Sequence, residues 1–226
     1  MHIKRFLFTA LVLFALVGLA SAEQVCTESE YKGRTIQQCR DTGSPGGGGS
    51  FSDSFTDPRD GQTYRTVQIG NQTWMAENLN YHTEGSSCYG DKPANCQKYG
   101  RHYTWEAALD ACPSGWHLPS MAEFDTLIAT VGGVDVAGKV LKSKSGWKSD
   151  GNSTDAYGFS ALPAGYRYPD GDFGLAGYYA NFWSTTEDWR LAADFMSLKY
   201  DDDHAYLFDG RKLYGISVRC LRDSRL

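Results

Sequence analysis

The amino-acid sequence predicts an α+β fold, with two short helices, short antiparallel strands and long loops. Two helical patterns lie together in the stretch 104–131, and several short strand patterns separated by turn residues follow Gly158. Helices and strands that occupy separate stretches of a chain are typical of α+β domains, in which the sheets are antiparallel. Export and an even number of cysteines further predict that disulfides hold this fold together.

The chain begins with the pattern of a secretory signal peptide. Lys4 and Arg5 form a basic start, residues 6–19 are almost entirely apolar, and Ala20-Ser21-Ala22 is a triplet that signal peptidase accepts. We expect cleavage after Ala22. The apolar run is shorter than the roughly 20 residues that a membrane-spanning helix needs, so we expect no membrane anchor.

Composition after the cleavage point narrows the range of partners. Without Lys4 and Arg5, 20 basic residues stand against 27 acidic residues, which gives a net charge of −7. Nucleic acid and anionic membrane surfaces attract basic proteins, so neither is an expected partner. No later stretch is apolar enough to insert into a membrane.

Export also decides how the cysteines are interpreted. The six are Cys26, Cys39, Cys88, Cys96, Cys112 and Cys220. An even number outside the cytosol predicts structural disulfides, although the spacing alone leaves every pairing open. No Cys-x-x-Cys occurs, and no histidine is three to five residues from another, so the spacing predicts no zinc site.

Three segments follow the signal peptide. Residues 23–41 form a short polar segment with two cysteines, and residues 42–54 are rich in Gly and Ser. Such a composition is typical of a flexible linker. Residues 55–223 then have a common size for a single globular domain.

The first element expected in this domain is a β-hairpin. Residues 63–70 and 72–79 flank Gly70-Asn71, a dipeptide that accepts the positive φ of a tight turn.

Two helices follow. Thr104 is positioned to cap a helix over residues 105–112, which Pro113 would end. Ser120 and Glu123 form a capping box at the start of a second helix. Its apolar residues recur at helical spacing on one face, and Gly132-Gly133 ends it: Phe124, Leu127, Ile128 and Val131.

The remaining elements are strands. Residues 193–200, 205–208 and 215–221 are short stretches rich in apolar and aromatic residues, with turn residues between them. They predict three strands.

Several short motifs follow one another through the domain. They are Asp60-Gly61-Gln62-Thr63-Tyr64, Trp74-Met75-Ala76-Glu77-Asn78-Leu79, Tyr99-Gly100-Arg101-His102-Tyr103-Thr104-Trp105, Ala111-Cys112-Pro113-Ser114-Gly115-Trp116-His117-Leu118-Pro119-Ser120, Gly158-Phe159-Ser160-Ala161-Leu162-Pro163-Ala164-Gly165-Tyr166-Arg167, Phe182-Trp183-Ser184-Thr185-Thr186-Glu187 and Ser217-Val218-Arg219-Cys220. Over residues 57–223 the chain thereby resembles the Fibrobacter succinogenes major paralogous (FISUMP) domain. The resemblance implies a C-type lectin-like fold, related also to formylglycine-generating enzymes.

This resemblance also implies a disulfide pattern. In C-type lectin-like domains, a cysteine after the first helix is joined to one in the last strand. The corresponding pair here is Cys112 and Cys220. Cys88 and Cys96 are then expected to close a local loop, which leaves Cys26 for Cys39.

No sequence motif predicts catalysis. Gly158-Phe159-Ser160-Ala161-Leu162 lacks the final glycine of a G-x-S-x-G elbow, and neither a P-loop nor H-E-x-x-H occurs. Formylglycine-generating enzymes use reactive cysteines near the end of their domain, but Cys220 here has an expected structural partner. We therefore expect no catalytic residue and no cofactor.

Candidate metal ligands are few. The triplets of the calcium-dependent sugar site in true C-type lectins are absent. Asp201-Asp202-Asp203-His204 has the oxygen ligands that calcium prefers, but a solvated turn between two strands is the favoured interpretation. His117 is expected to be partly buried and hydrogen-bonded, and to bind no metal.

Three tryptophans are the candidate ligand-binding residues. Trp147, Trp183 and Trp189 lie in loop-rich surroundings, and an exposed aromatic ring can stack on a sugar ring. Core packing is the alternative for each of them, and it is favoured for Trp183.

The expected function is that of a non-catalytic binding module, secreted or held in the cell envelope, in the periplasm or at the outer surface. Its expected ligand is a polysaccharide or a cell-surface protein. A structural component of a secreted or envelope assembly is the first alternative. An activity like that of the formylglycine-generating enzymes is the second.

Overall fold

The computed structural model describes residues 24–31, 34–41 and 50–224, with side chains from Ser54 onward. The expected signal peptide, its cleavage after Ala22 and most of the expected linker lie outside these residues. The chain divides into two units, residues 1–45 and 46–226, which are described separately.

The first unit contains a β-hairpin. Strands β1 (Gln24–Tyr31) and β2 (Arg34–Asp41) are antiparallel, and their register places Cys26 opposite Cys39. The disulfide expected between these cysteines involves side chains outside the described part, so it stays a prediction.

One sheet of the second unit has five strands in the order β3-β4-β5-β15-β8. They are β3 (Ser50–Thr56), β4 (Thr63–Ile69), β5 (Gln72–Met75), β15 (Leu221–Arg222) and β8 (Trp116–His117). The β4–β5 pair is the hairpin that the Gly70-Asn71 turn predicts, although β5 ends four residues before the expected position 79. Strand β3 begins within residues 42–54, the range expected for the linker.

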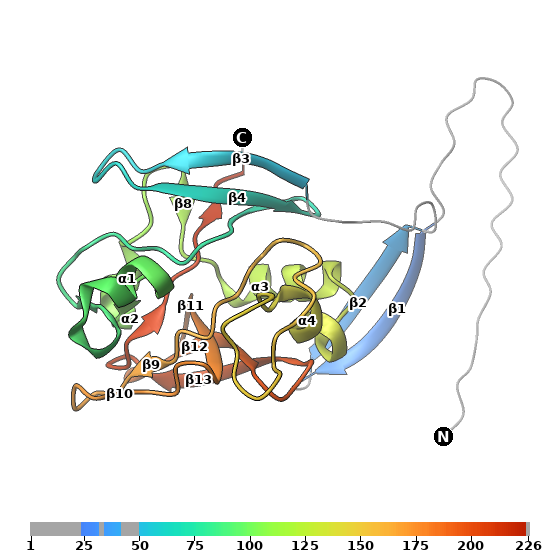
Figure 1. Cartoon of the computed structure of the whole chain (residues 1–226). Coiled ribbons are helices and arrows are strands. Elements are labelled where there is room, and N and C mark those ends of the chain that lie inside the picture. The colour runs from blue at the N-terminus through green and yellow to red at the C-terminus, as the bar shows by residue number, and fades with distance from the viewer. Residues whose placement is uncertain (1–23, 32–33, 42–49, 225–226) are drawn as a thin grey trace, which may run out of the picture. The chain divides into compact units, whose positions relative to one another are not determined.

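The larger sheet has six strands in the order β13-β12-β11-β14-β7-β6. They are β13 (Ala205–Arg211), β12 (Ala192–Lys199), β11 (Tyr179–Trp189), β14 (Ile216–Ser217), β7 (His102–Tyr103) and β6 (Ser86–Ser87). A small sheet pairs β9 (Tyr166–Arg167) with β10 (Phe173–Gly174). Figure 1 shows β11 to β13 on the side of this unit opposite to β3 and β4.

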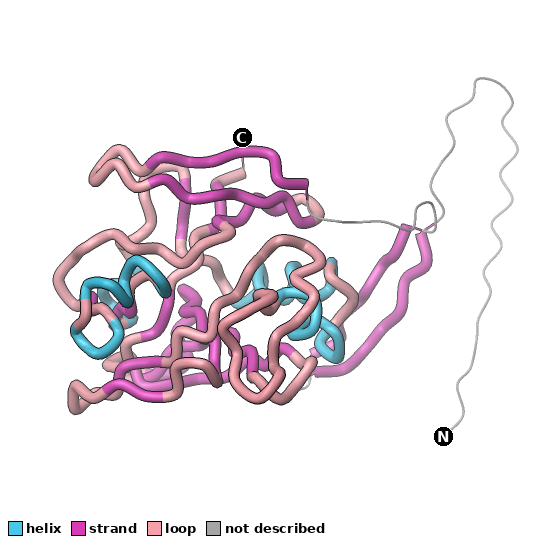
Figure 2. Tube along the Cα trace, viewed as in Figure 1, coloured by secondary structure: helices cyan, strands magenta, loops and turns pink. Residues whose placement is uncertain are grey.

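Four short α-helices complete the described fold, where the sequence predicts two. They are α1 (Pro93–Tyr99), α2 (Trp105–Leu109), α3 (Met121–Thr130) and α4 (Val134–Leu141), and a 3₁₀ turn at Tyr89–Asp91 precedes α1. Helix α3 packs on β11 and β12, and α4 packs on β13 (Figure 2). Among the described residues, no helix is both long enough and apolar enough to cross a membrane.

The observed bounds of α2 and α3 test the two predicted helices. The capping box of α3 is confirmed, with Ser120 and Glu123 each satisfying a backbone N–H of the other. The predicted helix 105–112 is too long, because α2 ends at Leu109 and Ala111 then donates a tight-turn hydrogen bond to Ala108. The proline at 113 disfavours helical backbone in the residue before it, so the helix stops early.

Two strand predictions need correction. The stretch 215–221 is not one strand, because β14 belongs to the six-stranded sheet and β15 to the five-stranded one. The sequence also fails to predict β11, the longest strand of the larger sheet. Its residues 180–184 are all buried, so it lacks the polar–apolar alternation that marks a half-exposed strand.

Two disulfides are present among the residues whose side chains are described, and they are two of the three expected pairs. Cys112 and Cys220, 108 residues apart in sequence, have Cα atoms 5.9 Å apart. Cys88 and Cys96 close a local loop with Cα atoms 4.9 Å apart. Cys220 belongs to the hydrophobic core, so the longer bridge is anchored inside the domain.

Candidate functional site

One face of the larger sheet carries a polar row beside an aromatic row. The register places Asn181 of β11 beside Ser197 of β12, and Ser197 beside Tyr206 of β13. Two positions along the strands, Phe195 of β12 lies beside Phe208 of β13. Residues two apart on a strand point to the same face, so these side chains share one surface.

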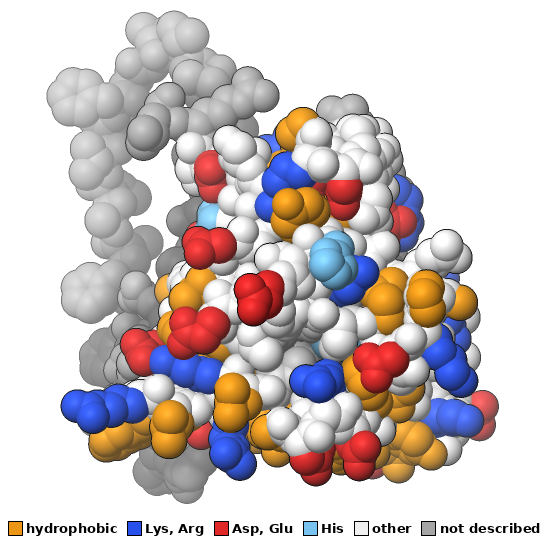
Figure 3. Space-filling view, turned by 90° about the vertical axis from the view of Figure 1, so that its left-hand side faces the viewer, with side chains coloured by type: hydrophobic (Ala, Val, Ile, Leu, Met, Phe, Trp, Pro, Cys, Tyr) orange, Lys and Arg blue, Asp and Glu red, His pale blue; other side chains and the backbone are white. Residues whose placement is uncertain are grey.

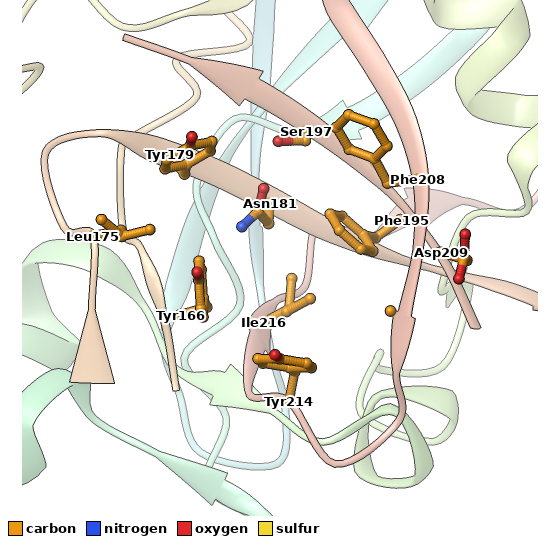
Figure 4. Close-up of a pocket in the computed structure, with 11 residues that line it drawn as sticks. Tyr166, Leu175, Tyr179, Asn181, Phe195, Ser197, Phe208, Asp209, Tyr214 and Ile216 are labelled. Carbon is orange, nitrogen blue, oxygen red and sulfur yellow. The ribbon is translucent and has the colours of Figure 1, made fainter. Parts of the chain in front are cut away.

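Loops cover this surface and enclose a pocket of about 290 Å³. Its lining combines aromatic, aliphatic and polar groups: Tyr166, Leu175, Tyr179, Asn181, Phe195, Ser197, Phe208, Asp209, Gly210, Tyr214 and Ile216. In Figure 4, Asn181 lies near the middle, with Tyr166 and Tyr214 on one side and Phe195 and Phe208 on another.

Contacts between rings hold the aromatic walls in place. Tyr166 meets Tyr214 edge-on, with ring centroids 5.6 Å apart, and it meets Tyr168 edge-on at 4.9 Å. On the other wall, the centroids of Phe195 and Phe208 are 6.1 Å apart. Edge-to-face pairs are stabilising arrangements of aromatic rings, so the walls are formed before any ligand enters.

The floor of the pocket presents hydrogen-bonding groups. Asn181 is 4% exposed, and its Oδ1 has no hydrogen-bond partner among the described residues. Ser197 beside it is also buried. A buried polar atom without a partner is destabilising, and such atoms are rare in folded proteins. The carboxylate of Asp209 can accept a hydrogen bond from a ligand directly, and the Asn181 oxygen can do so once its side chain turns toward the pocket.

Two of the three candidate tryptophans lie in the core, which is the interpretation favoured for Trp183 and the alternative left open for Trp147. Trp183 is fully buried, and its indole N–H donates to the carbonyl of Tyr103 over 2.8 Å. Trp147 is 6% exposed, and its N–H donates to the Ser143 hydroxyl over 3.0 Å. Both rings belong to the interior because it satisfies their single polar group and buries their large apolar area. Neither can stack on a ligand.

Trp189 is the exposed one, at 73%. It ends β11 and lies outside the lining of the pocket. The structure therefore does not bring the three tryptophans into one site.

The sequence reasoning missed the tyrosines that do line the pocket, although one signal was available. Tyr166 lies within a family motif and directly follows Ala164 and Gly165. These two residues are small, so they leave room around its ring.

The Asp201–Asp203 turn contains its own cation. The buried ammonium of Lys142 donates to the carbonyls of Lys199 (3.0 Å) and Asp202 (2.8 Å). The carboxylate of Asp202 accepts hydrogen bonds from Tyr206 and His204, and these bonds lower its pKa. Lys142 thus places a positive charge against the backbone of this turn.

His117 lies in an ion-pair network, partly exposed. Its Nδ1 is 2.6 Å from Asp223, and its Nε2 is 2.9 Å from Glu123. Burial opposes the charged ring, but the hydrogen bonds with the two carboxylates raise the pKa of His117 above its usual value. Both ring nitrogens face acceptors, so the protonated form fits this position and the ring has no lone pair left for a metal.

Comparison with known proteins gives one match. A family model described as the Fibrobacter succinogenes major domain matches residues 67–222, which lie within the domain expected over 55–223. The match confirms the family resemblance over residues 67–222, and of the ordered motifs only the first, residues 60–64, lies before the matched range. No curated protein and no solved structure matches the chain.

Proposed function

The chain belongs to the Fibrobacter succinogenes major domain family, and we propose that it is a non-catalytic module that binds polysaccharide in the β11–β13 pocket. The observation that carries this proposal is the buried, unpartnered Oδ1 of Asn181 between two aromatic walls. A sugar ring has apolar C–H faces and hydroxyl groups around its edge. Aromatic rings contact such faces, while amide and carboxylate oxygens accept hydrogen bonds from the hydroxyls.

The position of the pocket favours a polymer over a single sugar. Strand β13 is the outer strand of its sheet, and its residues Phe208 and Asp209 line the pocket. Phe208 is 40% exposed, and its ring is parallel to that of Tyr206, with centroids 5.4 Å apart. A glycan that occupies the pocket with one residue can therefore continue past this aromatic pair at the sheet edge.

The proposal that the module is non-catalytic is supported by its cysteines. The four cysteines with described side chains are joined in Cys88–Cys96 and Cys112–Cys220. A sulfur in a disulfide cannot act as the nucleophilic thiolate that chemistry like that of formylglycine-generating enzymes needs. A free-thiol count on the folded protein tests this point, and a reactive thiol would revive the enzyme alternative.

We include two further statements in the proposal. The fold is C-type lectin-like, supported by the disulfide that joins Cys112, just after α2, to Cys220, just before the last strand β15. The protein is exported to the envelope or beyond, supported by its disulfides and by the signal-like pattern of residues 1–22.

Retention on insoluble polysaccharides tests the binding function. We expect Asn181→Ala and Tyr214→Ala to weaken retention about tenfold each, which corresponds to about 1.4 kcal/mol. Trp189→Ala is the matched control, because it removes an exposed aromatic ring outside the pocket. We expect its retention to equal that of the unaltered protein.

The opposite pattern would favour the structural alternative. Trp189 and Leu191 are 73% and 77% exposed at the β11–β12 turn, and exposed apolar side chains favour contacts with other proteins. If polysaccharides retain none of these proteins, and if only Trp189→Ala loses association with envelope extracts, the chain is a component of an assembly.

A further inference from the structure

A second pocket lies across the backbone from the aromatic one. On β9, Arg167 follows Tyr166, so the two side chains point to opposite faces. After β13, Gly215 follows Tyr214. The two segments are joined there, because Arg167 and Gly215 exchange backbone hydrogen bonds of 2.9 Å in both directions. Tyr166 and Tyr214 line the first pocket, and Arg167 and Gly215 line the second.

This second pocket has a volume of about 330 Å³ and is largely polar. Its lining comes from β6, the 3₁₀ turn, the start of α2 and β9: Gly85, Ser86, Ser87, Asp91, Thr104, Arg167 and Gly215. The face shown in Figure 3 carries both basic and acidic side chains, and several acidic ones gather on its left part.

The guanidinium of Arg167 lies against an aromatic ring but makes no hydrogen bond or ion pair with any described residue. Its Cζ lies 5.8 Å from the centre of the Phe173 ring. Its Nη2 lies close to Gly171, since a Cβ built on that glycine would be only 3.2 Å from it. The Nε of Arg167 is buried and has no hydrogen-bond partner among the described residues. None of the ion pairs between described residues involves Arg167.

A second guanidinium adds positive charge on the same side. Arg101 donates from Nη1 to the hydroxyl of Ser86 over 3.4 Å, and its Nε is also buried without a partner among the described residues. Buried donors without acceptors are rare, and each one calls for a physical explanation. An anionic ligand in this pocket would supply acceptors for the Nη groups of Arg167, while Arg101 lies outside the lining and adds only nearby positive charge.

We propose that this pocket binds an oxyanion group (a carboxylate, sulfate or phosphate substituent) through the guanidinium of Arg167. A planar guanidinium can donate two parallel hydrogen bonds to two oxygens of such a group. Asp91 lies at the exposed rim with a φ of 54°, a left-handed conformation that is uncommon outside glycine. Its carboxylate weakens anion binding and can accept a hydrogen bond from a hydroxyl next to the oxyanion.

The test is a titration of the ¹⁵N-labelled protein, followed by amide chemical shifts. Sodium acetate, sulfate and phosphate are added separately at constant ionic strength, so the three arms identify which oxyanion binds best. We expect saturable shifts at the amides of Ser87 and Gly215. Arg167→Gln should weaken binding at least tenfold, and Arg167→Lys should weaken it less because the charge remains.

Two further variants complete the design. Asp91→Asn should tighten binding about threefold, because it removes the opposing charge and because asparagine also tolerates a positive φ. Arg190→Gln removes an exposed positive charge outside this pocket and should leave binding unchanged.

Several outcomes would overturn the proposal. Chemical shifts that rise linearly without saturation would mean that Arg167 holds no oxyanion. The same conclusion would follow if folded Arg167→Gln and Arg167→Lys bind as well as the unaltered protein. Equal losses in Arg190→Gln and Arg167→Gln would show that only overall charge matters. The sugar pocket is not involved in this titration, so failure here leaves the polysaccharide proposal standing, and the reverse also holds.

Discussion

Arg219 is a fully buried arginine that oxygen atoms of neutral groups stabilise. Its Nε and Nη2 both donate to Asn78 Oδ1, at 3.2 and 2.6 Å, and its Nη1 donates to the carbonyls of Met75 and Phe159. The guanidinium also lies over the rings of Phe159 and Phe182. One side chain thus joins β5, the loop at 159 and the segment between β14 and β15.

Replacement of this residue should be among the most destabilising changes in the domain. Arg219→Met leaves the Asn78 oxygen and two carbonyls without a donor, and each such loss costs about 1–3 kcal/mol. We expect a decrease of at least about 3 kcal/mol in the free energy of urea unfolding. Arg211→Met, at an exposed position, is the control and should change it by less than about 0.5 kcal/mol. Similar effects of the two variants would contradict this role.

His102 makes stability depend on pH. It is fully buried, its Nε2 contacts the carbonyl of Ala164 at 3.1 Å, and its Nδ1 has no partner among the described residues. Burial lowers the pKa of His102 to about 4. The unfolded chain then binds more protons than the folded one below pH 6.5, so stability falls as pH decreases from about 6.5 to 4.

The size of this effect can be measured. The shift corresponds to roughly 3 kcal/mol, complete above pH 6.5 and lost as pH falls to about 4. We expect His102→Gln to have a flatter stability profile over this range in chemical denaturation. His117 has a raised pKa, so its contribution is complete below pH 6.5 and does not produce the same slope. An unchanged slope in His102→Gln would refute the assignment.

At the level of elements, α3 is connected through its N-terminus to two other parts of the chain. The Ser120 backbone N–H donates to Glu123 Oε2 over 2.7 Å, and the other oxygen of Glu123 contacts His117 of β8. His117 in turn contacts Asp223 after β15. The capping box thereby joins a helix start, a strand and the end of the described chain.

Removal of the N-cap side chain should lower the stability of the whole domain and not only fray the first turn of α3. Ser120→Ala removes the hydroxyl that accepts from the Glu123 N–H and donates to Glu123 Oε2, and loss of an N-cap side chain costs about 1 kcal/mol. Thr126→Ala on the exposed side of α3 is the control, because its hydroxyl bonds only the carbonyl one turn back. Thermal unfolding should show a lower melting temperature for Ser120→Ala alone. Equal melting temperatures for the two variants would contradict this.

Helix α4 shows why one element was missed. It has no side-chain cap at Gly133, and its own sequence contains valines and Gly138, which are weak helix formers. A Cβ at 138 would lie 2.7 Å from backbone atoms of Asp203, so the helix packs directly against the β12–β13 turn. Tertiary contact therefore overrides local preference here, and local patterns alone cannot reveal it.

At the level of the whole domain, the two sheets share one segment. The chain passes from β14 in the larger sheet to β15 in the smaller one within residues 216–222, and Cys220 lies in this crossing. The disulfide joins the crossing to Cys112, just after α2. Reduction of this disulfide should therefore loosen the point at which the two sheets meet.

The two disulfides should differ in their contribution to stability. In the chain-entropy model, the bridge across 108 residues contributes about 4.7 kcal/mol and the bridge across 8 residues about 2.6 kcal/mol. We expect the Cys112→Ala/Cys220→Ala variant to unfold at a lower urea concentration than Cys88→Ala/Cys96→Ala. The reverse order would show that loop length does not govern stability in this fold.

The sequence determined the elements whose signals lie within a few residues of one another. The capping box of α3 and the turn of the β4–β5 hairpin are local, because the groups that form each hydrogen bond are neighbours in the chain. The ordered motifs determined the family, and through it the pairs Cys88–Cys96 and Cys112–Cys220. These conclusions needed no knowledge of how distant segments meet.

Only the tertiary structure decided which aromatic residues are accessible. Trp183 and Tyr179 lie on the same strand, but non-local pairing and covering loops bury the first and place the second in a pocket. Asn181 becomes an unpartnered acceptor only because β9 and the segment before β14 close over β11 and β12. Burial depends on what packs above a side chain, and residue type alone does not specify that.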